Sequence, residues 1–223
     1  MSLSTTIARR YFFAKKSTNA INIISGISVT GVVVATMALV IVLSVFNGFH
    51  DLVASFFTTF DPQIELTPRK GKSVPADDPL LAKVKSLPEI DVATECVEDQ
   101  ALAVYDGRQI MVRIKGVEDN FQYLTNIRSI LYGDGDFTLH AADLEYCIPG
   151  IRAAQDLGVG AYWNGYIKIY APQRDGQIDM MNPGAAFNVD SLMSAGCVFN
   201  VRQMKYDKQY ILTSIAFARK LFF

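Results

Sequence analysis

The sequence predicts an α+β protein in which one N-terminal transmembrane helix precedes a mixed globular domain. One observation is a long uncharged stretch, since no Asp, Glu, Lys, Arg or His occurs from Ser17 to Phe49. Another is that the roughly 170 residues after it alternate between strand-like and helix-like apolar patterns, without repeats or low-complexity tracts. A segment of that size is long enough for one medium domain or two small ones with hydrophobic cores.

The uncharged stretch has the length and composition of a membrane span. Its second half, Val29–Phe46, is almost wholly apolar, and at about 1.5 Å per residue a helix of that length nearly covers the roughly 30 Å hydrocarbon core of a bilayer. In a soluble domain, a helix without a polar face would have to be buried on all sides. We therefore predict a transmembrane helix over residues 20–49, which extends to about residue 60.

The charges that flank the span predict its orientation. Lys and Arg favour the cytoplasmic side, and four basic residues precede the span while an acidic one follows it: Arg9, Arg10, Lys15, Lys16 and Asp51. Of 21 basic and 22 acidic residues, 17 and 22 lie after the span. Residues 1–19 are therefore expected in the cytoplasm, and residues 61–223 form a domain on the other side. The alternative is a cleaved signal peptide, but the apolar run is long, begins well inside the chain, and no A-x-A-like site follows Phe49.

Residues 1–19 have the composition of an interfacial helix. Ile7, Tyr11, Phe12 and Phe13 can face lipid while the basic residues stay at the headgroups. A disordered basic tail is the alternative for this segment.

Small residues within the span predict close packing against another helix. They occur four apart in Gly26/Thr30 and Gly31/Ala35, and Ala38 extends the second pair by about one turn. The alternative is that Gly and Ala are simply common in membrane spans. The opposite face, with Met37, Val40, Val42 and Phe46, is expected to face lipid or a lipid-like substrate.

After the span, the pattern predicts elements in a definite order. The helix continues through Phe49–Phe60 and ends before Asp61-Pro62, because a residue that precedes proline is pushed out of helical geometry. The expected elements up to residue 117 are a strand Gln63–Pro68, a loop Gly71–Asp78, a helix Pro79–Leu87, strands Asp91–Cys96 and Gln100–Tyr105, a hairpin turn Asp106-Gly107 and a strand Gln109–Val117.

The second half of the domain continues the mixed pattern. We expect a loop with a helical turn at Asp119–Ile127, a helix Pro149–Leu157 ended by Gly158, a strand Gly165–Tyr170 closed by Ala171-Pro172, an exposed excursion Gln173–Ala186, strands Phe187–Met193, Val198–Lys205 and Gln209–Thr213, and a helix Ser214–Phe223. Because that last apolar helix is cut in its third turn, we interpret the chain as truncated after Phe223.

Composition and motifs argue against several functions. A pI near 6.1 with interspersed charges disfavours nucleic acid as a partner. Cys96, Cys147 and Cys197 lack C-x-x-C or metal-ligand spacing, and one disulfide or three free thiols both remain open. His50 and His140 have no metal-ligand neighbours.

The sequence also predicts a protein that is not an enzyme and binds no cofactor or metal. It has no G-x-x-x-x-G-K-[ST] run for ATP and no catalytic grouping of Ser, Cys, His and Asp. The acidic cluster Glu89–Asp99 is interpreted as a solvated loop and strand surface.

The segment Ile7–Phe49 resembles the first membrane helix of lipoprotein-releasing (Lol-type) ABC transporter permeases, within the wider MacB/FtsX-like permease superfamily. The matching elements are the start IARRY, the core ISGISVTGV and the exit LSVFNGF. The domain order also resembles that family, through IELTP, a DG hairpin that ends in IKGV, a helix that ends near LGV, IKIYAP, and the closing YILTSIAFARKLF. The resemblance spans almost the whole chain.

The resemblance implies an architecture and a set of partners. Family members have four membrane helices, with a MacB-like periplasmic core domain, made of a porter-like α/β lobe and a β-rich lobe, between the first and second. This chain would be the first helix plus most of that domain, in the inner membrane of a Gram-negative-type cell. The implied partners are a cytoplasmic ABC ATPase that holds ATP and Mg, a second permease subunit, identical or homologous, a lipoprotein substrate and a periplasmic lipoprotein carrier.

The resemblance also implies two binding regions. A lipoprotein is held between the first and second helices, and a cleft that includes Met37, Val40, Val42 and Phe46 would cover its acyl chains, at roughly 0.8 kcal/mol per buried CH₂. In one subtype a β-hairpin hook grips the carrier. The loop Pro172–Phe187 sits where that hook would be, although it does not clearly repeat the hook's sequence, and its candidate carrier contacts are Arg174, Met180, Met181 and Pro183.

Two other functions are compatible with the residues. One is a MacB/FtsX-like mechanotransmission permease for efflux or for regulation of a cell-wall hydrolase. The other is a single-span anchored periplasmic binding domain, complete as written. The sequence leaves open the cargo, the identity of the second permease subunit and the pairing of the cysteines.

Overall fold

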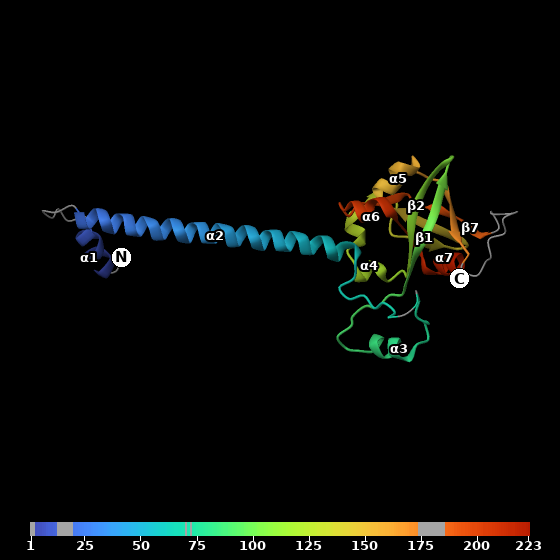
Figure 1. The fold of residues 1–223 in the computed structure, drawn as a ribbon, viewed down its shortest axis with the longest axis horizontal. Coiled ribbons are helices and arrows are strands. Elements are labelled where there is room, and N and C mark those ends of the chain that lie inside the picture. Colours follow the sequence, from blue (N-terminus) through green and yellow to red (C-terminus); the bar gives the residue numbers. More distant parts are fainter. Residues whose placement is uncertain (1–2, 13–19, 70, 72, 174–185) are drawn as a thin grey trace. The chain divides into compact units, whose positions relative to one another are not determined.

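The computed structural model describes residues 3–12, 20–69, 71, 73–173 and 186–223 and divides the chain into two compact units, Met1–Ala54 and Ser55–Phe223 (Figure 1). The first unit contains α1 (Leu3–Phe12) and most of α2 (Ala20–Phe60). Both helices were expected, and α2 continues beyond residue 49 up to Phe60. By length and composition its part Ala20–Val53 could cross a membrane, which fits a membrane-anchored protein.

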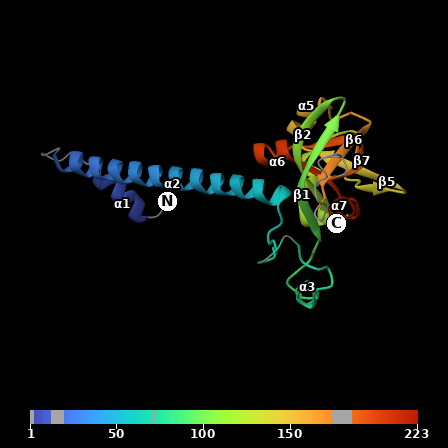
Figure 2. The same ribbon diagram turned by 45° about the vertical axis from the view of Figure 1, so that its right-hand side comes forward.

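The second unit begins with the last turn of α2 and a long, mostly exposed connection. The helix α3 (Pro79–Lys85) starts where the sequence predicts it, because the Asp78 side chain accepts a hydrogen bond from the backbone N–H of Leu80 at 2.8 Å. In Figures 1 and 2, α3 lies away from the sheet, and none of its residues is buried.

The strand expected at Gln63–Pro68 is wrong. No strand forms there, and Ile64 and Leu66 are 77% and 60% exposed. Alternation alone predicted this strand, but an isolated strand finds no partner for its backbone hydrogen bonds. Similarly, Asp91–Cys96 is not a separate strand, because β1 begins only at Cys96.

The expected hairpin is confirmed by β1 (Cys96–Tyr105) and β2 (Arg108–Val117), which pair antiparallel with Tyr105 opposite Arg108. Asp106 and Gly107 both have positive φ, 46° and 76°. Two such residues form the type I′ turn, whose twist matches that of the flanking strands.

The rest of the unit contains short helices and strands. Their bounds are α4 (Phe121–Leu124), the 3₁₀ helix η1 (Ile127–Ile130), β3 (Leu131–Gly133), β4 (His140–Ala141), β5 (Leu144–Pro149), α5 (Ile151–Leu157), β6 (Tyr166–Pro172), β7 (Phe187–Ser194), β8 (Cys197–Phe199), α6 (Met204–Gln209), β9 (Tyr210–Ser214) and α7 (Ile215–Phe222).

Most sequence-based expectations for this part are confirmed, with one correction. The single strand expected at Val198–Lys205 is wrong, because β8 ends at Phe199 and α6 begins at Met204. Arg202 between them has a positive φ of 63°, which interrupts extended backbone. The strands β3, β4 and β5 had no counterpart in the sequence-based expectation.

The strands form a large mixed sheet in the order β4-β5-β7-β6-β1-β2-β9. The strand β5 also pairs with β9, so the sheet curls back on itself, while β3 and β8 form a separate pair. Figure 2 shows β1, β2, β6 and β7 together. The pairs β2–β9 and β5–β7 are parallel, and the other neighbours in the large sheet are antiparallel.

Alternate residues of the sheet enter two hydrophobic cores. Ile114, Cys147 and Ile211 belong to a core that also contains residues of α5 and α7. Val117, Ile148 and Leu212, at the opposite alternation of the same three strands, belong to a second core with residues of α4, α6 and β8. This architecture confirms the expected fold class of one apolar helix followed by a mixed α/β domain with a large sheet. The division of that domain into two lobes stays a prediction.

Candidate functional site

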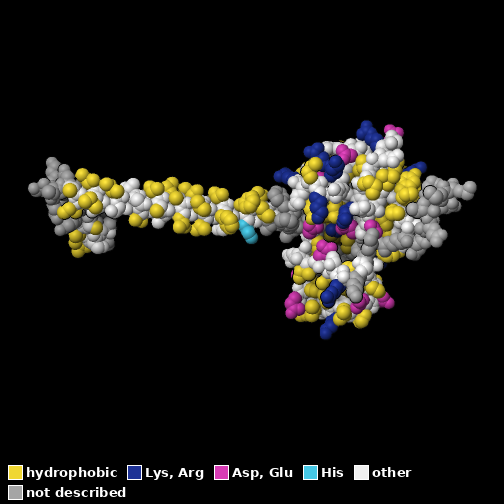
Figure 3. All heavy atoms as spheres, in the orientation of Figure 1, with side chains coloured by type: hydrophobic (Ala, Val, Ile, Leu, Met, Phe, Trp, Pro, Cys, Tyr) yellow, Lys and Arg dark blue, Asp and Glu magenta, His cyan; other side chains and the backbone are white. Residues whose placement is uncertain are grey.

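The described surface of α2 within the first unit is apolar and open. Figure 3 shows hydrophobic side chains along the visible face of this helix. The four residues predicted to contact a lipid-like substrate are 60–66% exposed: Met37, Val40, Val42 and Phe46. Side chains of this kind require lipid or another protein around them.

Three hydroxyl groups in this helix are satisfied by its own backbone. Ser28, Thr30 and Thr36 donate to the carbonyl oxygens of the residues four positions earlier, at 2.8–2.9 Å. A hydroxyl in hydrocarbon needs such a partner because no water is available. These three hydroxyl groups are therefore compatible with a membrane interior.

Helical geometry corrects the expected arrangement of the apolar residues. A residue is rotated by about 100° from its predecessor around a helix axis. Val40 thus lies about 60° from Met37, whereas Val42 and Phe46 lie about 140° and 180° from it. In the continuous helix α2, these four residues do not share one face.

The small residues divide between the same two sides. We call Gly26, Thr30, Met37 and Val40 the first face, and Gly31, Ala35, Ala38, Val42 and Phe46 the second face. Each set lies within about 80° around the axis. A Cβ atom added to Gly26 or Gly31 would meet nothing within 4 Å, so both faces are open to a neighbouring helix.

The end of α2 supplies a buried residue that sequence reasoning missed. The ring of Phe60 is 0% exposed and has centroid distances of 5.1 Å to Phe199, 4.8 Å to Tyr206 and 5.5 Å to Tyr210. We call these four residues the aromatic socket. The sequence feature that could have indicated this burial is the position of Phe60 as the last apolar residue before Asp61-Pro62.

Hydrogen bonds hold the two tyrosines of the socket. The Tyr206 hydroxyl donates to the carboxylate of Asp61, and the Tyr210 hydroxyl donates to Glu98 Oε1 at 2.9 Å. Burial and these carboxylates raise the pKa of Tyr206 and raise the pKa of Tyr210 to about 12. Both phenols are therefore neutral donors at physiological pH.

A buried lysine closes the socket from the sheet side. Lys115 on β2 is 7% exposed, and its Nζ atom lies 4.7 Å from the ring centroid of Phe60 and 5.6 Å from that of Phe121. Glu98 lies opposite Lys115 in the strand register, but its carboxylate is engaged by Arg113 at 2.5 Å and by Tyr210. Among the described residues, the cation of Lys115 is covered by aromatic rings and no carboxylate pairs with it.

The candidate carrier contacts Arg174, Met180, Met181 and Pro183 lie outside the described residues. The strands on both sides of them are described. They pair antiparallel up to Pro172 opposite Phe187, and the backbone N–H of Gln173 donates to Ala186 O at 2.8 Å. The pairing of β6 with β7 thus extends to the last described residues on both sides of this gap.

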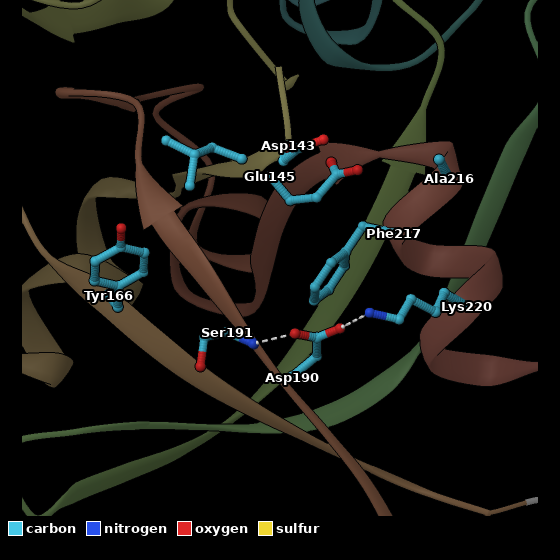
Figure 4. A pocket seen from close by; sticks show the side chains of 9 residues that line it. Asp143, Glu145, Tyr166, Asp190, Ser191, Ala216, Phe217 and Lys220 are labelled. Carbon is cyan, nitrogen blue, oxygen red and sulfur yellow. Dashed lines mark hydrogen bonds and ion pairs between the residues drawn. The ribbon is translucent and has the colours of Figure 1, made fainter. Parts of the chain in front are cut away.

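A pocket of about 310 Å³ lies between β5, β6, β7 and α7 (Figure 4). Its lining is Asp143, Leu144, Glu145, Tyr166, Asp190, Ser191, Ala216, Phe217 and Lys220. Figure 4 shows Asp190 directed toward Lys220, whose Nζ atom donates to it at 2.7 Å. This hydrogen bond raises the pKa of Lys220.

Two acidic side chains of the pocket are engaged by residues of other elements of the fold. Asp190 is engaged by Lys220, and Glu145 accepts a hydrogen bond from the Ser214 hydroxyl at 2.5 Å. No histidine or cysteine lines it. Among the described residues, no group of three His, Cys, Asp or Glu side chains is arranged for a metal ion.

The three cysteines are free thiols in the structure. Cys147 and Cys197 are buried, and burial raises the pKa of Cys147 to about 12 and that of Cys197 to about 11. They therefore behave as core side chains, not as reactive groups.

Comparison with known protein families places most of this fold in context. A family model described as "MacB-like periplasmic core domain" matches residues 25–163, which is more than half of the chain. No curated protein matches the chain. The matched range contains most of the membrane-span candidate, the hairpin β1–β2 and the domain as far as α5.

Proposed function

We propose that the chain, which belongs to the MacB-like periplasmic core domain family, is the permease subunit of an ABC transporter that releases lipoproteins from the inner membrane. Proteins of this family are generally membrane components of ABC transporters that work with an ATPase. The observation that carries the proposal is one chain that joins an open apolar helix to a MacB-like domain.

The subunit itself would be non-catalytic. ATP and Mg²⁺ would be bound by a separate cytoplasmic ATPase, and a second permease subunit would complete the pair. In this arrangement, residues 1–19 lie in the cytoplasm and the domain lies in the periplasm, where it meets a lipoprotein carrier.

We propose different roles for the two faces of α2, one in helix packing and the other in substrate contact. The second face has three small residues over about two turns, at Gly31, Ala35 and Ala38, and we assign it to packing against a neighbouring helix. We assign Met37 and Val40 on the first face to the cleft that covers the acyl chains. Extraction of such chains removes apolar surface from lipid, so a covered path lowers the work that ATP must supply.

Depletion of the protein in its own cells tests this proposal. If it releases lipoproteins, those destined for the outer membrane accumulate in the inner-membrane fraction, and the tagged full-length protein co-purifies with an ABC ATPase. Normal lipoprotein sorting after depletion would contradict the proposal. Co-purification with an ATPase and normal sorting would instead support a relative that drives efflux or regulates a cell-wall hydrolase.

A further inference from the structure

We propose that the edge of β7 that points away from β6, together with the pocket beside it, binds an extended peptide segment of a partner protein. The segment adds a strand to the sheet and places a basic side chain in the pocket. Proteins recognise extended peptides in this way when a strand edge is open and a neighbouring pocket accepts one side chain. The site lies within Ser55–Phe223 and does not depend on the proposed release of lipoproteins.

The ladder between β6 and β7 determines which backbone groups of β7 point outward. The backbone N–H of Ser194 donates to Gly165 O at 2.8 Å, so these two residues form a hydrogen-bonded pair. Such pairs occur at every second residue of an antiparallel ladder. Val189 and Ser191 lie five and three positions before Ser194, at non-bonded positions of the register. Their backbone N–H and C=O groups are therefore directed away from β6.

The strand β5 covers only the end of this edge. It pairs with the last two residues of β7, while its own first two residues pair with β4 instead. Among the described residues, none pairs with the backbone N–H and C=O of Val189 or with the C=O of Ser191. The N–H of Ser191 is different, because it donates to Asp190 Oδ1 at 2.8 Å. The open edge can thus exchange hydrogen bonds with one short extended segment.

Apolar side chains are exposed on this edge and in the pocket beside it. The exposed fractions are 51% for Val189 on β7, and 53% and 41% for Tyr166 and Leu144 in the pocket lining. A strand edge that faces only water usually carries charged side chains, because these prevent pairing with another chain. A bound segment would remove the apolar surface of these three residues from water.

The pocket has an excess of negative charge. Its volume of about 310 Å³ is near the lower end of the range for ligand clefts. Three carboxylates and one ammonium line it, a net of two negative charges: Asp143, Glu145, Asp190 and Lys220. Figure 4 shows Asp143 and Glu145 on the side of the pocket opposite Asp190 and Ser191. Because Lys220 is engaged by Asp190, the other two carboxylates are the ones that a ligand cation meets.

This lining is complementary to a lysine or arginine side chain of the partner. The stem of such a side chain is apolar and its end is charged, so it can cover Leu144 and Tyr166 while its cation reaches the carboxylates. An acidic side chain would be repelled from the same position. The partner is therefore expected to present a basic residue within an otherwise uncharged extended segment.

Contacts between β7 and α7 hold the groove in place. The Asn188 Nδ2 atom donates to Leu221 O at 2.9 Å, and the Lys220 Nζ atom donates to Asp190 at 2.7 Å. The residues of β7 that contact α7 thus alternate with those that form the open edge. A groove that is already formed loses little conformational entropy when a peptide binds.

Peptide binding to the full chain in nanodiscs of uncharged lipid tests the site. The probe is the blocked, fluorescent pentapeptide Thr-Val-Lys-Val-Thr, and its anisotropy is compared with that in empty nanodiscs. We expect saturable binding with a Kd below about 1 mM, and no binding of the peptide in which Glu replaces Lys. Absence of binding by the lysine peptide, or equal binding of both peptides, would overturn the proposal.

Substitutions at Val189 test the strand edge. Val189→Pro removes an outward N–H and spares the ladder with β6, a position at which proline is tolerated. Val189→Thr is the matched control, because it keeps the N–H and the branched shape. We expect the proline variant alone to weaken the lysine peptide, by about tenfold. Equal affinities of the two variants, compared after both have been shown to fold by their Tm, would overturn strand addition.

Methylation of the peptide backbone makes the same test without a change in the protein. Alternate amides of an extended peptide point to opposite sides, so only one alternate set can pair with β7. We expect methylation of the two valine amides and methylation of the two amides of Lys and the last Thr to differ in effect, one abolishing binding and the other not. Equal loss from both would contradict strand addition.

Substitution of Asp143 tests the pocket. Asp143→Asn should weaken the lysine peptide about threefold to tenfold, because one of the carboxylates that meets its cation is lost. The exposed Asp77, in the connection before α3, is the control, and Asp77→Asn should leave the affinity unchanged. Equal affinities of the two variants would overturn the role of the pocket. Dimers of the chain that Val189→Pro dissociates, without peptide binding, would show that the edge pairs with a second copy and would overturn the partner peptide.

Discussion

Three thiols and two phenols in the domain hold their protons more tightly than they would in the unfolded chain. These groups are Cys96, Cys147, Cys197, Tyr206 and Tyr210, and burial is the largest cause of each raised pKa. In the unfolded chain such groups ionise near pH 8.5 for thiols and near pH 10 for phenols, roughly. At a pH between the unfolded and the folded pKa of such a group, the group is ionised in the unfolded state and still protonated in the folded state.

We therefore expect stability to fall as pH rises above about 8.5, because the folded state then binds more protons than the unfolded state. Thermal unfolding of the full chain in detergent at pH 7.5, 9 and 10.5 measures this. The Cys147→Ala and Cys197→Ala double substitution should make the fall between pH 7.5 and 9 smaller, and the part that remains belongs to Cys96. A Tm that stays constant to pH 10.5 would show that these groups are not buried as described.

Gly116 lies at a point where β2 and α7 pack closely together. A Cβ atom added there would lie 2.3 Å from the Cβ of Ala218 and 3.0 Å from Ser214 O, under the first turn of α7. We expect Gly116→Ala to destabilise the domain by about 1–3 kcal/mol, because the helix must shift to make room.

The control for that substitution is Gly160→Ala, where an added Cβ meets nothing within 4 Å. Its Tm should stay within about a degree of the parent. If both alanine substitutions give the same Tm, then α7 does not pack on β2 as the structure describes.

At the scale of elements, Ser214 joins two parts of the fold. Its hydroxyl accepts a hydrogen bond from the backbone N–H of Phe217 at 3.0 Å, which caps α7, and it donates to Glu145 on β5. We expect Ser214→Ala to cost about 1–2 kcal/mol through the lost cap. The exposed Ser129, whose hydroxyl donates only to Asn126 O, is the control, and equal Tm values for Ser214→Ala and Ser129→Ala would contradict the role of the cap.

Elements with a strong local signal could be predicted from the sequence. The turn Asp106-Gly107, the Asp78-Pro79 start of α3 and the Gly158 end of α5 each depend on residues within one turn, and each was predicted. The strand β5 was missed because its partners β7 and β9 lie far along the chain. The strand expected at Gln63–Pro68 does not form, because an alternating apolar pattern does not by itself supply a neighbouring strand for backbone hydrogen bonds.

One part of the candidate site could be predicted from the sequence, and another part could not. The apolar surface of α2 could be predicted because hydropathy and length suffice for a membrane span. The aromatic socket could not, because the burial of Phe60 depends on Phe199, Tyr206 and Tyr210, which come near it only in the folded domain. The face shared by Met37 and Val40 was predictable, but adding Val42 and Phe46 to it ignored the rotation of about 100° per residue.

At the scale of the whole molecule, an exposed apolar helix that could cross a membrane and a domain with two hydrophobic cores belong to one chain. Family membership assigns that combination to ABC-transporter-type permeases. The proposal adds that one side of the helix covers the acyl chains of a lipoprotein. This claim concerns the first face, so substitutions on the two faces must differ in their effect.

The most direct test is ATP-dependent lipoprotein release from proteoliposomes that contain the assembled transporter with either Val40→Asp or Val42→Asp. Both substitutions place one carboxylate in the span at a similar depth, on sides about 160° apart, so each controls for the cost of inserting a charge. Co-purification of the ATPase and of the second permease subunit is measured beside release for each variant. The account predicts that Val40→Asp abolishes release from a transporter that still assembles, whereas Val42→Asp weakens assembly and loses release only in that proportion. Release by the assembled Val40→Asp transporter that equals that of the unsubstituted one would contradict it.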